Sequence, residues 1–299
     1  DGLRATASYT ETQRSTWNIS RAMALSIATR YPLTTHYQLL TMKSAKITTT
    51  TVKIVTVVTT KRIKNVKNPL FSNGFVIYNG PSMFDGKPIV VIVTGSRNPT
   101  LNPKTGAMLQ TWIMRSDIHP VEALRNGSDV SVCLNCPLRP KGKKGTKRAC
   151  YVNLLCLSVI YGQYKAGAYG TIANFSLGLS ARIGSYGDPT AVPIDVWMEL
   201  LNHIPFFTGY TRQWTNPKFQ GYKAFCMASC HNDSEYQAAI ALGWKAFIVR
   251  AIGSEVPIGA IQCPQLADPY VVTCASCKMC NGNTTSISVE AHGIGKRYV

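Results

Sequence analysis

The chain has few acidic residues and few histidines, and it lacks long apolar runs and the common catalytic motifs. No stretch of its 299 residues reaches the roughly 18 consecutive apolar residues of a membrane-spanning helix. The N-terminal segment shows no cationic start followed by an apolar run, so no secretory signal is predicted. The five histidines form no H-E-x-x-H pair, and neither a G-x-S-x-G elbow nor a G-x-x-x-x-G-K-[ST] phosphate loop occurs. Zincin, serine-hydrolase and P-loop chemistries are therefore not indicated.

The shortage of acidic residues leaves a large positive charge. Asp and Glu together number 14 against 32 Lys and Arg, which gives a formal net charge of +18. This excess favours an anionic partner, such as a small molecule, a nucleotide or nucleic acid. No helix-turn-helix, RNA-recognition or two-Cys two-His finger pattern accompanies it, so sequence-specific reading of DNA is not indicated. One basic loop is a candidate nucleic-acid contact, or else a solvated loop that steadies thiolates: Lys141, Lys143, Lys144, Lys147 and Arg148.

The chain has ten cysteines, and seven of them fall in two compact groups. In the C-terminal group the spacing C-x10-C-x2-C-x2-C lets four thiolates surround one metal centre without other ligands. A chain of this length can bury an ordinary core, and no secretory signal is visible. We therefore expect a reducing cytoplasm, in which clustered cysteines bind metal rather than form disulfides. The group comprises Cys263, Cys274, Cys277 and Cys280.

The upstream group is a C-x2-C pair, Cys133 and Cys136, joined by Cys150 across the basic loop. Three thiolates can hold a [4Fe–4S] cluster and leave one iron open to a substrate or cofactor. The C-x2-C-x2-C run of the C-terminal group resembles the loop that wraps ferredoxin-type clusters. A zinc knuckle completed by a distant Cys or His is the alternative for the upstream group.

Three further cysteines and one histidine lie outside these groups. Cys156, Cys226 and Cys230 are predicted to be core thiols or accessory ligands. His292, shortly after the last cysteine, is either a hydrogen-bond donor to a cluster sulfur or an exposed tail histidine.

Composition divides the chain into segments. Residues 1–41 are rich in Thr and Ser without a sustained period, and we expect a disordered or non-native leader there. Residues 42–299 are predicted to form a single α/β domain, with a cysteine-rich insert at 130–156 and a cysteine-rich C-terminal segment at 260–299. Residues 43–67 are dense in β-branched residues and lysines, which predicts strands at a lysine-protected sheet edge rather than a nucleic-acid arm.

The order of predicted elements indicates a parallel sheet. Residues 88–95 form an apolar run of strand length. Residues 151–167 predict a helix with apolar residues at helical spacing, namely Val152, Leu155, Val159 and Ile160. Strand then helix then strand follows from about residue 180 to 250 at intervals of roughly 20 to 25 residues. The predicted fold class is α/β with parallel βα units, as a complete or partial βα barrel.

This architecture predicts where a ligand would bind. Ligands of parallel βα folds lie beyond the carboxyl ends of the strands, where polar residues follow strand after strand. Arg212 and Arg250 could clamp a carboxylate or phosphate, and Asp188 could accept hydrogen bonds from an amine or ribose. The candidate substrate-binding residues are Ser185, Tyr186, Asp188, Thr208, Tyr210, Arg212, Gln213, Ser229 and Arg250.

A series of ordered motifs runs from about residue 76 to the end of the chain. They are NPKTGAMLQTWIM, the C-x2-C-P at Cys133, CYVN at Cys150, YKAGAYG, RIGSYGDP, TGYTRQW, MAS, LGWKAF-x-VR, CP at Cys263, C-x2-C-x2-C-x-G and AHG. In these motifs the chain resembles an uncharacterised family of bacteriophage proteins. That family is similar in layout to phage proteins whose cysteine motif precedes a βα barrel, and more distantly to radical S-adenosylmethionine enzymes.

The resemblance implies a function in outline. Radical S-adenosylmethionine enzymes hold a [4Fe–4S] cluster by three cysteines and often carry an auxiliary cluster near the C-terminus. The resemblance also implies S-adenosylmethionine as a cofactor and the cytoplasm of an infected bacterium as the location. The usual cysteine spacing of radical S-adenosylmethionine enzymes is C-x3-C-x2-C, whereas here thirteen residues separate Cys136 from Cys150. The first hypothesis is therefore an iron–sulfur redox or radical enzyme, and the alternative is a zinc-stabilised basic module that binds nucleic acid or a host protein.

Overall fold

The computed structural model describes residues 73–100, 102–139, 150, 152–171 and 178–292. The chain divides into two units, 1–60 and 61–299, and every described residue belongs to the second. The predicted leader at 1–41, the predicted strands at 43–67 and the basic loop at 141–148 lie outside the described residues.

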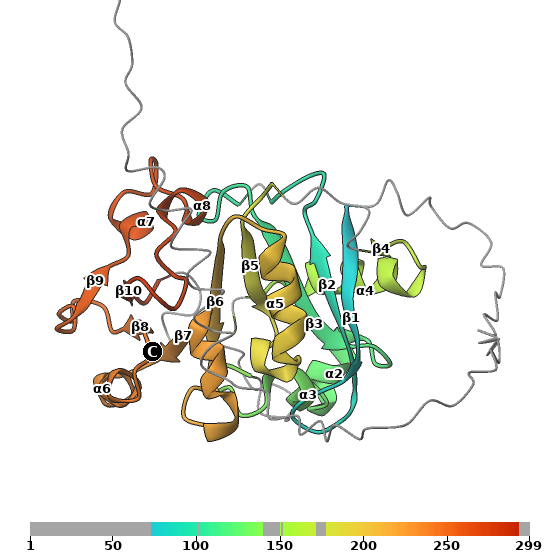
Figure 1. Cartoon of the computed structure of the whole chain (residues 1–299), viewed down its shortest axis with the longest axis horizontal. Helices are drawn as coiled ribbons and strands as arrows, with labels where there is room; N and C mark the ends of the chain where they lie inside the picture. Colours follow the sequence, from blue (N-terminus) through green and yellow to red (C-terminus); the bar gives the residue numbers. More distant parts are fainter. Residues whose placement is uncertain (1–72, 101, 140–149, 151, 172–177, 293–299) are drawn as a thin grey trace, which may run out of the picture. The chain divides into compact units, whose positions relative to one another are not determined.

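Ten strands and their connecting helices make up the described part (Figure 1). The strands are β1 (Gly74–Pro81), β2 (Pro88–Thr94), β3 (Leu109–Arg115), β4 (Gly170–Thr171), β5 (Ala181–Tyr186), β6 (Phe207–Thr211), β7 (Met227–Cys230), β8 (Ala246–Arg250), β9 (Ala260–Gln262) and β10 (Ser286–Glu290). The α-helices are α2 (Pro120–Asn126), α3 (Val130–Cys133), α4 (Leu154–Lys165), α5 (Ile194–Asn202), α6 (Asp233–Ala241), α7 (Pro264–Ala267) and α8 (Cys274–Cys277). Two 3₁₀ segments are η3 (Pro189–Ala191) and η4 (Pro217–Ala224).

The strands form one mostly parallel sheet in the order β4-β1-β2-β3-β5-β6-β7-β8-β10-β9. Neighbours run parallel except where β2 pairs with β1 and with β3. The α/β class and the parallel units from β5 onward are thus confirmed. The sheet ends on β4 and β9 and is open over the described residues, so these residues form no closed barrel. Its first three strands are an antiparallel meander instead of βα units, and the two edge strands are short.

Side chains alternate between two faces of this sheet. Residues paired in parallel register point to the same side, so the chain of pairs from Gln110 through Arg182 and Thr208 marks one face. We call the other face the covered face. It carries Ala181, Ile183 and the residues in register with them on neighbouring strands, which are buried under α5, η4 and α6. We call the first the open face and define it by its half-buried residues from β3 to β8: Gln110, Trp112, Arg182, Tyr210, Ser229 and Phe247.

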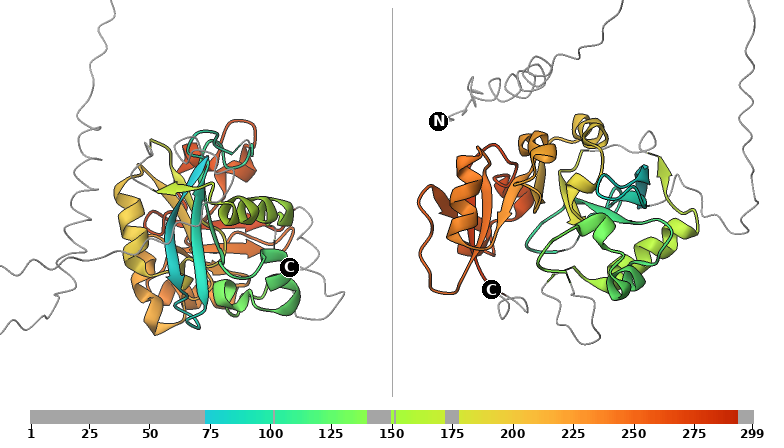
Figure 2. Two further views of the ribbon diagram at one scale, coloured as in Figure 1. Left: turned by 90° about the vertical axis from the view of Figure 1, so that its right-hand side faces the viewer. Right: turned by 90° about the horizontal axis from the view of Figure 1, so that it is seen from below.

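Local chemistry explains where the helices begin. Asn153 caps α4 by accepting a hydrogen bond from the Leu155 amide at 2.9 Å. Asn232 caps α6 by accepting from the Glu235 amide at 2.8 Å. Figure 2 (left) shows α5 and α4 on opposite sides of β1 and β2. None of the helices in the described part of the chain combines the length and the apolar character that a membrane crossing requires.

The predicted apolar face of α4 is only partly right. Leu155 and Val159 are 76% and 60% exposed. Ile160 is buried as predicted, together with Leu157 and Tyr161. Apolar residues occupy nearly its whole circumference, so periodicity could not single out the buried side.

Candidate metal centres and the open face of the sheet

The four C-terminal cysteines come together around one pocket. Cys263 follows β9, Cys274 and Cys277 begin and end α8, and Cys280 comes shortly after. All four line a pocket that holds about 290 Å³ of space between atoms, part of it open to solvent. Its other lining residues bring no carboxylate or imidazole: Thr208, Pro264, Gln265, Lys278, Met279 and Ile287.

Backbone contacts fix this segment against the sheet. The Cys263 amide donates to the Ser288 carbonyl at 2.8 Å, and the Gly209 amide donates to the Cys280 carbonyl at 3.2 Å. The Cys274 amide donates to the Lys104 carbonyl at 3.0 Å. Thr273 and Ser276 form a capping box at the start of α8, which satisfies amides that a helix of one turn leaves free.

Burial favours the protonated form of two of these thiols. It raises the pKa of Cys274 and raises the pKa of Cys280 to about 12. The Tyr210 hydroxyl donates to the Cys280 sulfur, and burial raises the pKa of that hydroxyl well above its usual value. Arg182 acts in the opposite direction on Cys274, because its positive charge favours the thiolate and lowers the pKa of Cys274. A metal ion or cluster bound here would therefore displace protons.

The upstream trio lies in a loop that an ion pair holds in shape. The Cys136 amide donates to the Cys133 carbonyl at 3.0 Å, and the Cys150 amide donates to the Leu138 carbonyl at 3.1 Å. Arg139 donates to both oxygens of the fully enclosed Asp129 carboxylate, at 2.8 and 2.5 Å. Burial, and then the neighbouring Cys136 thiol, raise the pKa of Cys133 well above its ordinary value.

This loop docks at the carboxyl ends of β5 and β6. The Asp188 amide, two residues past β5, donates to the Val132 carbonyl at 2.6 Å. Gln213, two residues past β6, donates through its side chain to Asn135 Oδ1 at 2.7 Å. The upstream cysteines therefore stand where the sequence placed the ligand-binding edge of the sheet.

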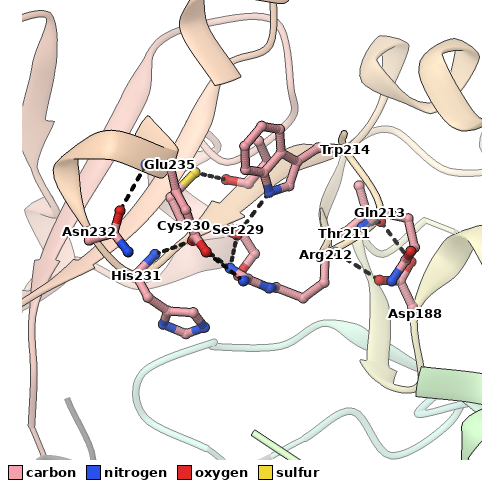
Figure 3. A network of polar contacts seen from close by, with 11 residues as sticks. Asp188, Thr211, Arg212, Gln213, Trp214, Ser229, Cys230, His231, Asn232 and Glu235 are labelled. Carbon is pink, nitrogen blue, oxygen red and sulfur yellow. Dashed lines mark hydrogen bonds and ion pairs between the residues drawn. The ribbon is translucent and has the colours of Figure 1, made fainter. Parts of the chain in front are cut away.

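Asp188 is the centre of a saturated hydrogen-bond network (Figure 3). Its Oδ1 accepts from the Thr190 amide at 3.0 Å, from the Thr190 hydroxyl at 2.8 Å and from the Thr211 hydroxyl at 2.8 Å. Its Oδ2 accepts from the Arg212 amide at 2.8 Å. With four donors already bound, this carboxylate joins β5 to β6.

Arg212 and Arg250 each already hold a carboxylate. Arg212 pairs with Glu235 through two hydrogen bonds of 3.0 and 3.1 Å and also donates to the Ser229 carbonyl (Figure 3). Arg250 contacts Glu290 at 3.3 Å and the Gln262 side chain at 2.9 Å. Their charges are therefore engaged within the fold.

The structure divides the candidate substrate residues between two places. Asp188, Arg212 and Gln213 lie in the network at the strand ends, and Tyr186 closes β5 beside it. Thr208, Tyr210 and Ser229 lie on the open face of the sheet. The other two have partners elsewhere: Ser185 donates to Gln110 at 2.7 Å, and Arg250 lies at the end of β8.

Sequence reasoning missed Arg182, the charged residue on the open face. The search for binding residues looked at strand ends, and Arg182 is the second residue of β5. A cation inside an otherwise apolar strand, between the buried Ala181 and Ile183, was the available signal. Of the three cysteines predicted to be core thiols or accessory ligands, Cys226 and Cys230 are buried, whereas Cys156 is exposed on α4 and is not a core thiol.

Within the described ranges, no group of three or more His, Cys, Asp or Glu side chains is arranged to hold a single metal ion. The cysteines surround a pocket instead. No family model, curated protein or solved structure matches the chain.

Proposed function

We propose that this chain is an iron–sulfur protein with two cysteine-held centres that performs redox or radical-type chemistry at the carboxyl ends of β5 and β6. The observation that carries the proposal is the C-terminal pocket, where four thiols line one space without any carboxylate or imidazole. Cysteine thiolates are soft ligands, which suit iron–sulfur clusters and zinc and not the hard cations.

The arrangement of the thiols favours a cluster over a single ion. A tetrahedral zinc site with Zn–S bonds of about 2.3 Å needs its four sulfurs gathered around one point. The irons of a [4Fe–4S] cluster stand apart at the corners of a cube, and each takes its own thiolate, so the ligands surround a larger space. Four thiols distributed around a pocket match the second geometry better.

The upstream trio supplies the reactive centre in this proposal. Cys133, Cys136 and Cys150 offer three thiolates, so a [4Fe–4S] cluster held by them would keep one iron open to a substrate. The Asp129–Arg139 ion pair shapes the loop, and Asp188 ties that loop to the sheet through Val132. The resemblance to radical S-adenosylmethionine enzymes makes that cofactor the first candidate to test, in a protein acting in the cytoplasm of an infected bacterium.

Anaerobic purification tests the proposal. We expect a brown protein with about eight irons and about eight sulfides per chain, as two [4Fe–4S] clusters require. Cys277→Ala and Cys136→Ala should each lose about half of the iron, because each removes a ligand from one group. Cys156→Ala is the matched control, since Cys156 is exposed and outside both groups, and it should keep all the iron.

The zinc alternative predicts a different result in the same experiment. A colourless protein with one or two zinc ions would overturn the iron–sulfur proposal and support a zinc-stabilised, basic binding module. Equal iron loss in Cys156→Ala and Cys277→Ala would also count against it, because the loss would then not depend on the pocket.

A further inference from the structure

The helix α4 exposes a row of uncharged residues along one side. Leu155 and Val159 are 76% and 60% exposed, and Gly162 and Ala166 are exposed as well. The steps between these four residues are four, three and four, which is the spacing of the seam of a coiled coil. We call this row the α4 seam. A leucine and a valine exposed in line on a twelve-residue helix indicate a surface that contacts another molecule.

The order of large and small residues in the α4 seam suits a second copy of the same helix. The two large residues come first along the chain, and the two small ones follow. When two copies pair antiparallel about a twofold axis midway between Val159 and Gly162, Val159 of each faces Gly162 of the other. In the same arrangement Leu155 of each copy faces Ala166 of the other. Every large side chain therefore meets a small residue, whereas a parallel pair would set glycine against glycine and leave a gap.

Space for this packing is present at the middle of the α4 seam. A Cβ built at Gly162 meets nothing within 4 Å, so a side chain from outside can approach the helix backbone there. The valine of the second copy is the residue that the twofold axis brings to this point. Glycine lowers the stability of a helix interior, and close approach of a partner gives a physical reason for it here.

Charge does not oppose the pairing, although the chain carries a formal net charge of +18. The single charged residue of α4 is Lys165. Its Nζ lies 5.9 and 6.0 Å from the ring centroids of Tyr161 and Tyr164, which turns it away from the seam. In the antiparallel pair the two lysines stand about 13 Å apart along the axis, beyond the screening length of about 8 Å at 0.15 M salt. An acidic partner would find no cation in the seam, whereas a second copy matches it with an equally uncharged face.

We propose that two copies of this chain associate through the α4 seam, as an antiparallel pair of helices related by a twofold axis. One helix pair buries less than the roughly 1,600 Å² of a standard interface, so we expect a weak dimer with a Kd of about 1 to 100 μM. The inference goes beyond the proposed function, because the association needs no metal centre.

Sedimentation of the full chain over about 1 to 300 μM tests the proposal, and the fraction of dimer should rise with concentration. Leu155→Gln should raise the Kd by about 10-fold or more, because each dimer loses two buried leucines. Ile258→Gln is the matched control, since it removes an apolar side chain that is 95% exposed elsewhere, and it should leave the Kd unchanged. A wild type that stays monomeric at every concentration, or equal Kd values for wild type and Leu155→Gln, would overturn the proposal.

Gly162→Leu separates paired helices from unspecific apolar contact. The leucine has room in the single chain and is a better helix former than glycine, so the variant should fold at least as well. It should nevertheless raise the Kd of the dimer by about 10-fold or more, because it fills the space that Val159 of the second copy requires. Tighter association of Gly162→Leu would instead show that any added apolar surface promotes the contact, and the paired seam would be wrong.

Disulfide trapping tests the direction of the pair. In a Cys156→Ser background, Leu155→Cys and Ala166→Cys copies that carry different affinity tags should cross-link to each other on oxidation. Leu155→Cys copies alone should not, because the two cysteines would lie about 16 Å apart along the axis, beyond the roughly 7 Å between Cα atoms that a disulfide spans. Cross-linking of Leu155→Cys copies alone at the yield of the mixture would contradict the antiparallel arrangement.

Discussion

At the scale of single residues, the polar groups at the strand ends beside the cysteine loop form hydrogen bonds with one another. Asp188 was a reasonable candidate for binding an amine or ribose from sequence, because it follows a strand in a Gly-rich turn. The structure gives its carboxylate four donors from Thr190, Thr211 and Arg212. A carboxylate satisfied in this way stabilises the fold and positions the loop.

Asp188→Asn should therefore destabilise the protein. The asparagine side chain has an NH₂ group in place of one carboxylate oxygen. That NH₂ group would face either the Arg212 amide or the threonine donors, and two donors cannot hydrogen-bond to each other. We expect a loss of about 2 kcal/mol or more in the free energy of unfolding, measured by urea titration. Asp268→Asn, at an exposed position where the carboxylate accepts no hydrogen bond from a described residue, should change the free energy by less than about 0.5 kcal/mol. Similar losses in both variants would contradict this role for Asp188.

His231 makes stability depend on pH. Its Nε2 is buried and finds no hydrogen-bond partner among the described residues. Burial, followed by the nearby charge of Arg212, lowers the pKa of His231. The unfolded chain then takes up the proton first as pH falls through about 6.5, so stability is complete above that pH and decreases below it. His231→Asn should flatten the unfolding free energy between about pH 7 and 5. His231 contributes at most about 1.4 kcal/mol per pH unit to the fall in unfolding free energy, the value for one proton. Parallel wild-type and variant profiles would show that His231 contributes nothing to this slope.

At the scale of elements, glycines set how closely the strands approach. Gly187 follows β5 with φ +82°, and a Cβ there would lie 2.6 Å from Ile113 Cβ and 2.8 Å from the Ile113 carbonyl oxygen on β3. Gly127 follows α2 with nearly the same φ, +83°, and a Cβ there would meet nothing within 4 Å. An alanine would adopt the same unfavourable φ at either position, but only at Gly187 would its Cβ clash with a neighbouring strand.

Gly187→Ala should be much more damaging than Gly127→Ala. The left-handed conformation costs an alanine about 1 to 2 kcal/mol at either position. At Gly187 the clash with β3 adds overpacking of about 1 to 3 kcal/mol. We expect the difference between the two variants to appear as a lower urea midpoint for Gly187→Ala. Equal midpoints would show that β3 moves aside freely.

The elements also show how far sequence reasoning reached. The strand and helix alternation from β5 to β8 was predictable because each unit carries its own caps and apolar pattern, as Asn232 does for α6. The antiparallel meander β1-β2-β3 was not predicted, because pairing partners depend on contacts distant in the chain. Arg182 was missed for a related reason: only the register between β3, β5 and β6 shows that its neighbours in the sheet are Gln110 and Thr208, neither of which is acidic.

At the scale of the whole described unit, the two cysteine groups lie in segments with little core of their own. The C-terminal segment contains the four-residue helices α7 and α8, and it packs on a small cluster of Met227, Ile287 and Val289. The upstream loop depends on the Asp129–Arg139 ion pair and a few backbone hydrogen bonds. The strands β2 and β3, in contrast, are almost wholly buried. Ligand binding at sites of this kind contributes directly to folding free energy.

Removing the metal should therefore loosen these segments selectively. Chelation under anaerobic conditions, followed by hydrogen exchange, should speed exchange of amides in 263–283 and 133–139, while β2 and β3 stay protected. The Cys274 amide, which donates to Lys104, is a specific reporter because it links the C-terminal segment to the loop before β3. In Cys277→Ala the same exchange should appear in 263–283 without chelator and leave 133–139 unchanged. Uniformly faster exchange across β2, β3 and both segments would mean that the centres stabilise the whole unit. Unchanged exchange would mean that neither segment depends on a metal.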